Sequence, residues 1–364
     1  MSAAVESKDE FFMGRALTLA ARGLYTTDPN PRVGCVLVRD DCILGEGWHE
    51  RAGEAHAEVT ALRAAAGTGG AEGATAYVTL EPCSHTGRTP PCADALIAAG
   101  IRRVVCASPD PNPKVAGLER LRAVGLGVTV GVLERAARAL NPGFFSRFER
   151  GRPLIRLKLA MSLDGRTAPA PGGSLWITGE AARADVQTWR ARSSAVLTGA
   201  GTVRVDDPRL DVRLAYGPWV RQPLRVLLDP ALSCPPSARI FKDGGALVFA
   251  AASAISRAQD LACSVERVPA VDRALDLGAV TLRLSAREIN EVLVECGPRL
   301  AAAFFAANLV DELIVYVAPI LLGADAAPLT ALHGLGLGPL PTFEYQSQQR
   351  VGSDMRLVLI PKGR

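Results

Sequence analysis

Apolar residues in the first 130 positions recur with two spacings, one typical of helices and one typical of strands. Residues 10–23 place Phe11, Phe12, Ala16, Leu19 and Ala20 at helical spacing, and Gly23 ends this segment. Residues 33–49 alternate as two short strands around Asp40-Asp41, which predicts a β-hairpin. Helices are also expected over 55–66 and 91–100, strands over 74–80 and 102–108, and a helix followed by a strand over 118–131. This order predicts a mixed sheet covered by helices.

The pattern starts afresh after residue 150. A helical stretch over 133–150, interrupted at Asn141-Pro142-Gly143, leads to Gly151-Arg152-Pro153, where we place the boundary between domains at 1–150 and 151–364. Further strands are expected over 153–168, in the residues leading to a glycine turn at 199–201, and over 224–229 and 246–251. Thr178 is expected to cap a helix over 180–192. Residues 289–323 predict a strand, a Gly297-Pro298 turn, a helix and a second strand.

Composition narrows the function classes. Nearly half of the 364 residues are hydrophobic (48%), which argues against long disordered segments. The formal net charge of +4 includes no basic run of five or six residues, so we expect no nucleic-acid partner. No apolar run reaches the roughly 18 residues that span a bilayer, so no membrane partner is expected. The eight cysteines follow no regular spacing and the chain begins without an apolar signal core, so a reducing cytoplasm is expected.

One stretch contains the residues of a metal site. His56 and Glu58 lie two apart, and Cys83 and Cys92 flank a loop rich in proline, serine and glycine. One imidazole and two thiolates suit zinc, and three protein ligands leave a fourth position open for water. His56 and Cys92 are both expected at the start of a helix, where the dipole favours a thiolate. A carboxylate beside such a site can move protons without binding the metal, as in the zinc deaminases.

A structural zinc site is the alternative interpretation. Such a site has four protein ligands, and His85 is the residue that would supply the fourth. This interpretation leaves Glu58 without a purpose. It also gives no role to Arg88, which lies in the loop between the cysteines and is placed to face an anionic substrate. The catalytic interpretation is therefore preferred.

Charged residues and glycines at strand ends supply the candidate chemistry of the second half. Gly199 and Gly201 suggest a dinucleotide fingerprint, but Arg204 occupies its third glycine position, so a standard Rossmann crossover is not predicted. The Gly297-Pro298 turn opens a helix whose N-terminus suits phosphate, or simply separates strand from helix. Lys158, Asp206 and Glu295 are expected to converge at one cleft; the alternative is ordinary charge at strand ends.

With these motifs assembled, the chain resembles the bifunctional riboflavin-biosynthesis proteins, in which a pyrimidine deaminase is fused to a 5-amino-6-(5-phosphoribosylamino)uracil reductase. The resemblance covers nearly all of residues 10–360. In the first half it rests on TTDPNPRVGCV, GEGWHERAGEAHAEV, ATAYVTLEPCSHTGRTPPC and DPNPKVAG. In the second half it rests on LKLAMSLDGRTA, SLWITGEAARADVQTWRARS, TGAGTVRVDDPRLDVR, VECGPRL and VDELIVYVAPILLG. The eight-residue spacing of the GRTPPC loop is its most specific element.

The resemblance implies an α/β protein with a cytidine-deaminase-like mixed-sheet domain followed by a dihydrofolate-reductase-like domain that uses NADPH. It places the zinc ligands on His56, Cys83 and Cys92 and the proton shuttle on Glu58. Asn30 and His49 would border the pyrimidine. The cofactor contacts would fall on Ala160, Trp176, Thr202, Asp206 and the turn of Gly297, Pro298, Arg299 and Leu300. The other substrate contacts would fall on Ser174, Arg190, Leu210, Arg213 and Glu295.

The implied chemistry has two steps on one phosphorylated pyrimidine. Deamination of 2,5-diamino-6-(5-phosphoribosylamino)pyrimidin-4(3H)-one would be followed by reduction of the ribosyl group to a ribityl chain. Glu58, Lys158 and Asp206 are the expected catalytic residues, and a homo-oligomer is expected. Two rival hypotheses are a deaminase of nucleic acid or free nucleosides and a zinc-stabilised binding module. A deaminase of nucleic acid or nucleosides would not need the domain at 151–364. A zinc-stabilised binding module requires a closed four-ligand site and no NADPH binding.

Overall fold

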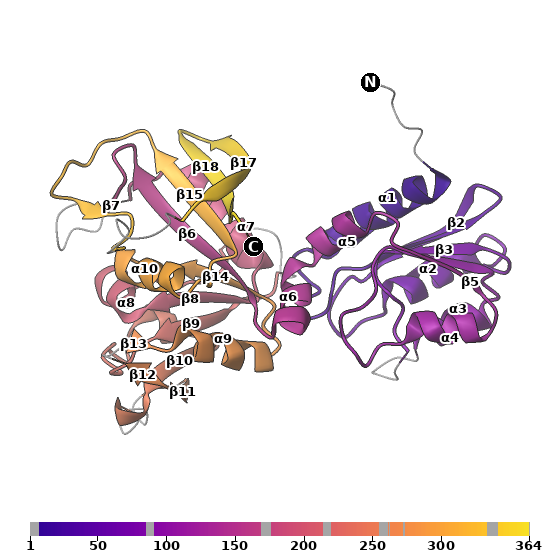
Figure 1. Ribbon diagram of the computed structural model, residues 1–364, viewed down its shortest axis with the longest axis horizontal. Helices are drawn as coiled ribbons and strands as arrows, with labels where there is room; N and C mark the ends of the chain where they lie inside the picture. Colours follow the sequence, from indigo (N-terminus) through magenta and orange to yellow (C-terminus); the bar gives the residue numbers. More distant parts are fainter. Residues whose placement is uncertain are drawn as a thin grey trace. The chain divides into compact units, whose positions relative to one another are not determined.

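The computed structural model describes residues 7–84, 91–168, 176–213, 220–254, 261, 263–271, 274–332 and 341–363. The chain divides into two compact units, Met1–Arg150 and Gly151–Arg364. Each unit contains its own sheet with helices on both faces, and each is described by itself (Figure 1). Among the described residues, no helix combines the length and the apolar character needed to cross a membrane.

The first unit is built on a five-stranded sheet in the order β2-β1-β3-β4-β5. Its strands are β1 (Gly34–Arg39), β2 (Cys42–Trp48), β3 (Thr75–Val78), β4 (Arg103–Cys106) and β5 (Gly127–Val130). β1 pairs antiparallel with β2 and β3, whereas β3, β4 and β5 are parallel. Asp40 and Asp41 join β1 to β2 with φ values of 51° and 60°, the conformation that a two-residue hairpin turn requires. The predicted hairpin and mixed sheet are therefore confirmed.

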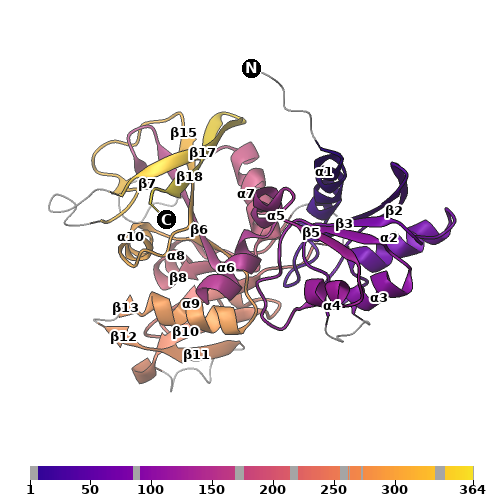
Figure 2. The same ribbon diagram turned by 45° about the vertical axis from the view of Figure 1, so that its right-hand side comes forward.

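Helices cover both faces of this sheet (Figure 2). α2 (Ala57–Ala66), α3 (Cys92–Ala98) and α4 (Gly117–Ala123) pack on one face. α1 (Lys8–Ala20), which the 3₁₀ turn η1 (Ala21–Gly23) extends, and α5 (Glu134–Leu140) pack on the other. α6 (Pro142–Arg150) follows α5 after a break at Asn141, as the Asn-Pro-Gly sequence predicts.

Glycines in β2 let α2 lie directly on the strand backbone. A Cβ atom placed on Gly47 would lie 2.5 Å from the carbonyl oxygen of Ala57 and 2.5 Å from the backbone nitrogen of Ala61. Gly45 faces the next turn of α2 equally closely, with a Cβ position 2.3 Å from the carbonyl oxygen of Ala61. Because α2 begins immediately after His56, this contact fixes the position of the histidine relative to the sheet.

The second unit contains a nine-stranded sheet in the order β11-β10-β9-β8-β14-β6-β15-β18-β17. Its strands are β6 (Leu154–Ser162), β8 (Ala195–Gly199), β9 (Leu224–Leu228), β10 (Ala246–Ala251), β11 (Ser264–Val268), β14 (Glu291–Glu295), β15 (Glu312–Ala318), β17 (Phe343–Val351) and β18 (Asp354–Pro361). The first seven strands in this order are parallel, and β18 and β17 add an antiparallel hairpin at one edge. Two short pairs accompany the sheet, β12 (Ala270–Val271) with β13 (Ala274–Leu275) and β7 (Arg166–Ala168) with β16 (Ala327–Pro328).

Two apolar clusters lie on the two faces of this sheet. α9 (Leu277–Ala286) and α10 (Pro298–Ala306) cover one face. α7 (Glu180–Arg192), α8 (Ala200–Asp206) and the 3₁₀ turn η2 (Arg239–Phe241) cover the other. The face under α7 also buries charge, because the Arg156 guanidinium lies between the carboxylates of Glu291 and Glu312. Charges buried in this way are retained only when they are paired.

Two local expectations for the second unit are wrong. α7 begins after Gly179 and receives no side-chain cap, so Thr178 does not cap it. The Gly179 N–H donates instead to a carboxylate oxygen of Asp354 at 2.8 Å, which replaces a local cap by a long-range one. The glycine turn expected at 199–201 is the start of α8, where Gly199 is the N-cap. Val203 is buried and α8 therefore gains packing that outweighs the low helix propensity of Gly201.

Candidate functional site

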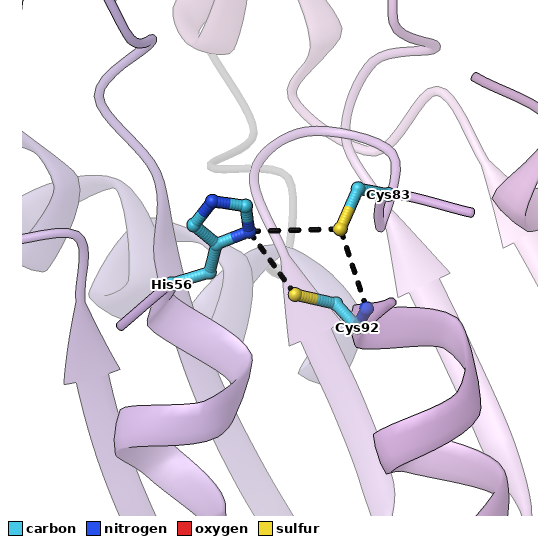
Figure 3. Close-up of side chains that lie close together, drawn as sticks. All are labelled: His56, Cys83 and Cys92. Carbon is cyan, nitrogen blue, oxygen red and sulfur yellow. Dashed lines mark hydrogen bonds between the residues drawn. The ribbon is translucent and has the colours of Figure 1, made fainter. Parts of the chain in front are cut away.

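His56, Cys83 and Cys92 lie together in the first unit (Figure 3). The ligand atoms of all three lie within 4.8 Å of one another. The Nδ1 atom of His56 is 3.2 Å from the Sγ atom of Cys92 and 3.6 Å from that of Cys83. The backbone N–H of Cys92 donates to the Sγ atom of Cys83 at 3.3 Å. The three residues therefore present one nitrogen and two sulfurs to a common point.

Two helix N-termini and one strand end bring these residues together. His56 is the N-cap of α2, and Cys92 is the first residue of α3, as the sequence predicts. Cys83 lies in the loop that follows β3. Each of these helices begins at the cluster, where the positive end of the helix dipole favours anionic sulfur.

The donor set fits zinc. A hydrogen bond from Cys92 lowers the pKa of Cys83 to about 4, and the same hydrogen bond raises the pKa of Cys92. A negative charge on one sulfur therefore opposes a second negative charge on the other. A dication between them removes this repulsion, and one imidazole with two thiolates is a soft set that zinc prefers. Among the described residues, these three supply the candidate ligands.

Glu58 is the second residue of α2, lies beside the cluster and is 3% exposed. Burial raises the pKa of its carboxyl group to about 7, and the neighbouring His56 opposes that rise. A carboxyl group with this pKa can both accept and release a proton near neutral pH. Its position and its pKa suit a proton carrier.

Asn30 and His49 form a second pair next to the cluster. The Nδ2 atom of Asn30 is 3.1 Å from the Nε2 atom of His49, whose Nδ1 atom is 3.1 Å from the Ala55 carbonyl oxygen. Since a carbonyl oxygen only accepts, Nδ1 carries the proton and Nε2 accepts from the Asn30 amide. Burial lowers the pKa of His49 and favours this neutral ring. The Asn30 amide oxygen is then left to accept a hydrogen bond from another molecule.

The loop that contains Cys83 is held by a segment that sequence reasoning missed. The carboxylate of Glu81 accepts from the backbone N–H groups of Leu118 at 3.0 Å and Asp110 at 3.2 Å. The Ser84 hydroxyl accepts from the Ala116 N–H at 2.8 Å. A Cβ atom on Gly117 would lie 1.8 Å from the carbonyl oxygen of Pro82. The segment of DPNPKVAG therefore packs directly against the loop; its proline and glycine content was the only signal for this contact.

His85 and Arg88, the two loop residues considered in the sequence, lie outside the described residues. The structure therefore tests neither His85 as a fourth zinc ligand nor Arg88 as an anion contact. Ser174, expected at the reductase substrate site, also lies outside the described residues.

A charged cluster lies under α7 in the second unit. The Arg190 guanidinium donates to both carboxylate oxygens of Glu295, at 2.6 and 2.9 Å, and to the Asp211 carbonyl oxygen at 3.1 Å. Lys158 in β6 lies directly across from Glu295 in β14. Burial lowers the pKa of Lys158, Glu295 raises it and Arg190 lowers it further. Arg213 also lowers the pKa of Glu295, so four of the predicted residues meet here.

Five of the residues expected at the cofactor lie around two neighbouring helix N-termini. Thr202 belongs to α8, and Gly297 is the N-cap of α10, whose first residues are Pro298, Arg299 and Leu300. A Cβ atom on Gly199 would lie 3.1 Å from the side chain of Leu300, so the starts of α8 and α10 are in contact. Both helices begin at the carboxyl ends of adjacent parallel strands, where α/β sheets bind ligands.

Four other predicted residues lie apart from that contact. Ala160 lies in β6 opposite Tyr316 of β15. Trp176 is 77% exposed, and the Arg183 guanidinium lies 5.1 Å from the centre of its ring. Leu210 is buried in the loop after α8. Asp206 is the exposed last residue of α8 rather than a residue just beyond a strand, because α8 replaces the expected turn.

Comparisons with protein families match both units. Residues 6–108 match the cytidine and deoxycytidylate deaminase zinc-binding region. Residues 153–357 match the RibD C-terminal domain. The two matches leave between them the segment in which the unit boundary lies.

Similar proteins and structures cover nearly the whole chain. A riboflavin biosynthesis protein RibD of Escherichia coli K12 is 50% identical over 366 residues, covering 97% of this chain and 99% of that protein. The RibD structure from Acinetobacter baumannii, form 1, is 45% identical with a TM-score of 0.91, covering 97% of this chain and 99% of that one. A Thermotoga maritima structure, described as a diaminohydroxyphosphoribosylaminopyrimidine deaminase/5-amino-6-(5-phosphoribosylamino)uracil reductase, is 34% identical with a TM-score of 0.84, at 97% and 98% coverage.

Proposed function

The chain belongs to the RibD family of riboflavin-biosynthesis proteins, and on that premise we propose which residues carry out its two reactions. It is a bifunctional enzyme, a zinc-dependent pyrimidine deaminase joined to an NADPH-dependent reductase. We assign deamination of 2,5-diamino-6-(5-phosphoribosylamino)pyrimidin-4(3H)-one to the first unit. The second unit then reduces the ribosyl group of 5-amino-6-(5-phosphoribosylamino)uracil to the ribityl form.

In the first unit, His56, Cys83 and Cys92 would hold the zinc ion, which would supply a water that is nucleophilic near neutral pH. Glu58 is placed to take a proton at its carboxylate and to give it to the departing amine, which requires a carboxyl group that titrates near neutrality. Asn30 presents its amide oxygen to N–H groups of the pyrimidine, and His49 fixes the orientation of that amide.

In the second unit, the starts of α8 and α10 would hold the cofactor. Thr202 and the turn that begins at Gly297 lie at helix starts, whose backbone N–H groups suit the phosphates of NADPH. Ala160, Trp176 and Asp206 complete the proposed cofactor contacts. NADPH supplies a hydride when it is bound.

The charged cluster under α7 binds and protonates the substrate. Glu295, held by Arg190, accepts from ribose hydroxyls, and Arg213 approaches the phosphate with Leu210 bordering the same site. Ser174 stays a substrate contact predicted from the sequence. Reduction adds a hydride to C1 of the ribosyl group, and the bond from C1 to the ring oxygen breaks with its electron pair moving to that oxygen. The Lys158 ammonium gives its proton to this oxygen, which becomes a hydroxyl group.

The observation that supports the deaminase assignment most strongly is the convergence of His56, Cys83 and Cys92 beside a buried Glu58. Glu58→Gln should keep zinc, because the amide replaces a group that is not a ligand. Ammonia release should fall about 10²–10⁴-fold, while reduction of the deaminated substrate continues. Loss of zinc in Glu58→Gln would make Glu58 a ligand and overturn the assignment.

A second pair of variants tests the reductase assignment. Lys158→Met and Asp206→Asn should slow reduction of the deaminated substrate, since a reacting carbon misplaced by about 1 Å costs about 10²-fold. Ammonia release from the diamino substrate should not change in either variant. Parental reduction rates in both would show that the lysine and the helix-end aspartate are scaffold.

We also expect the enzyme to form a homo-oligomer, to act in the cytoplasm and to have no nucleic-acid partner. The thin spread of its net charge of +4 supports the last expectation. Light scattering on the purified chain measures the first expectation directly.

A further inference from the structure

Tyr316 is a fully buried tyrosine in β15 beside the proposed reductase site, and no sequence motif assigns it a role. Its ring lies under Lys158, with the ammonium nitrogen 5.9 Å from the ring centre. In the register of β15 and β6, Tyr316 is directly opposite Ala160, and Ile314 is opposite Lys158. Tyr316 therefore adjoins two residues of β6 that we place at the cofactor and the substrate.

The hydroxyl end of the Tyr316 ring is held by charged groups. The Tyr316 hydroxyl donates to a carboxylate oxygen of Asp185 in α7 at 2.5 Å. Arg356 in β18 lies opposite Tyr316 and donates to both oxygens of the same carboxylate, at 2.8 and 2.9 Å. Burial, together with the hydrogen bond to Asp185, raises the pKa of Tyr316, so the phenol stays neutral. The ring face toward Lys158 is thus fixed in position.

An ammonium group over a tyrosine face is attracted by the negative charge of the ring face, and the attraction grows when water is excluded. Lys158 needs such support because burial alone disfavours its charged form. Glu295 on the other side supports the charge, whereas Arg190 opposes it. Cys296, the residue after β14, also raises the pKa of Lys158, and Arg213 lowers the pKa of Glu295.

We propose that Tyr316 is a positioning residue for the reduction: its ring face holds the Lys158 ammonium in place and favours the protonated state that gives the proton to the ring oxygen. Asp185 and Arg356 fix the ring. The proposal rests on the role assigned to Lys158 above, and it adds the group that sets the orientation and the charge of that lysine.

The expected signature is a shift in the pH profile of the reduction. If Lys158 acts as the acid, the rate falls as pH rises through its pKa. Without the ring face, the charged form of Lys158 is less stable and its pKa falls. The alkaline limb, which is the part of the profile where the rate falls as pH rises, then moves to lower pH. The strength of a desolvated cation–π contact predicts a shift of about one pH unit. A residue that only fills space would change the rate without moving the limb.

The experiment measures the rate of reduction of the deaminated substrate at saturating NADPH across pH in the full chain. Tyr316→Leu should move the alkaline limb down by about one unit. Tyr345→Leu is the matched control, because Tyr345 lies in β17 of the same unit and is 66% exposed. Its limb should match that of the parent.

A second series keeps the shape of the core. Fluorinated phenylalanines at position 316 withdraw charge from the ring face stepwise at nearly constant volume, and Tyr316→Phe serves as their parent. The alkaline limb should move to lower pH with each added fluorine. A limb that stays fixed along this series, or in a folded Tyr316→Leu variant, overturns the proposal.

Lys158→Met distinguishes this failure from failure of the proposed function. Slow reduction by Lys158→Met together with a fixed limb in the position-316 series would reject only the role of Tyr316. A parental rate in Lys158→Met would instead reject Lys158 as the acid, and with it the premise of the inference.

Discussion

Glu81→Gln tests whether the segment after β4 holds the zinc loop in place. The two carboxylate oxygens of Glu81 accept hydrogen bonds from the backbone N–H groups of Leu118, at 3.0 Å, and Asp110, at 3.2 Å. Glutamine offers one oxygen, so one N–H loses its acceptor and faces an amide NH₂ instead. A hydrogen bond to a charged group contributes about 1.5–3 kcal/mol. If this energy holds Cys83 in its binding position, zinc affinity should fall about ten- to a hundredfold.

Competition with a chromogenic zinc chelator measures that affinity, and ammonia release measures the consequence for deamination. Glu119→Gln is the matched control, since Glu119 is an exposed carboxylate in the same segment. Reduction of the deaminated substrate should be unchanged in both variants. A Glu81→Gln enzyme with parental zinc affinity and parental ammonia release would refute the reasoning.

Three further predictions concern the scaffold. Arg156→Met removes the buried guanidinium that pairs with Glu291 and Glu312 and should lower the free energy of unfolding by about 3–5 kcal/mol in chemical denaturation, whereas Lys8→Met, which breaks an exposed pair, should change it by less than about 1 kcal/mol. Gly47→Ala should force α2 off β2 and weaken deamination more than reduction, because its Cβ atom would lie 2.5 Å from helix backbone; Gly14→Ala, with open space at the Cβ position, should leave both activities unchanged. Cutting the chain after Arg150 should leave each unit able to unfold cooperatively, and failure of both fragments would argue against independent folding.

Local spacing predicted much of the first unit. The hairpin around Asp40-Asp41, the helix after His56 and the helix that begins at Cys92 each follow from turn residues, apolar periodicity or a proline at the right place. The same features placed the three candidate zinc ligands at two helix starts and one strand end. Short-range patterns succeed there because the signals are contained within about ten residues.

Features that depend on the tertiary path of the chain could not be predicted in this way. The partners of Glu81 are backbone groups 29 and 37 residues away, and no side-chain pattern marks them. Asp354 replaces Thr178 at the start of α7 from 175 residues away. In α8, the glycines predicted a turn, and burial of Val203 outweighed that local preference. Lys158 and Tyr316 lie on strands that are far apart in the sequence, β6 and β15. They come into contact because these two strands are neighbours in the sheet.

The most direct test of the central claim follows both reactions of the intact chain on one substrate. The zinc-loaded enzyme is incubated with 2,5-diamino-6-(5-phosphoribosylamino)pyrimidin-4(3H)-one, with and without NADPH, while ammonia and NADPH oxidation are recorded separately. Ammonia should appear in both samples, and NADPH should be oxidised only after ammonia release begins. Glu58→Gln should lower both signals from this substrate about 10²–10⁴-fold yet oxidise NADPH normally with the deaminated substrate. NADPH oxidation by Glu58→Gln on the diamino substrate at the parental rate, or no ammonia from the parent enzyme, would contradict the account.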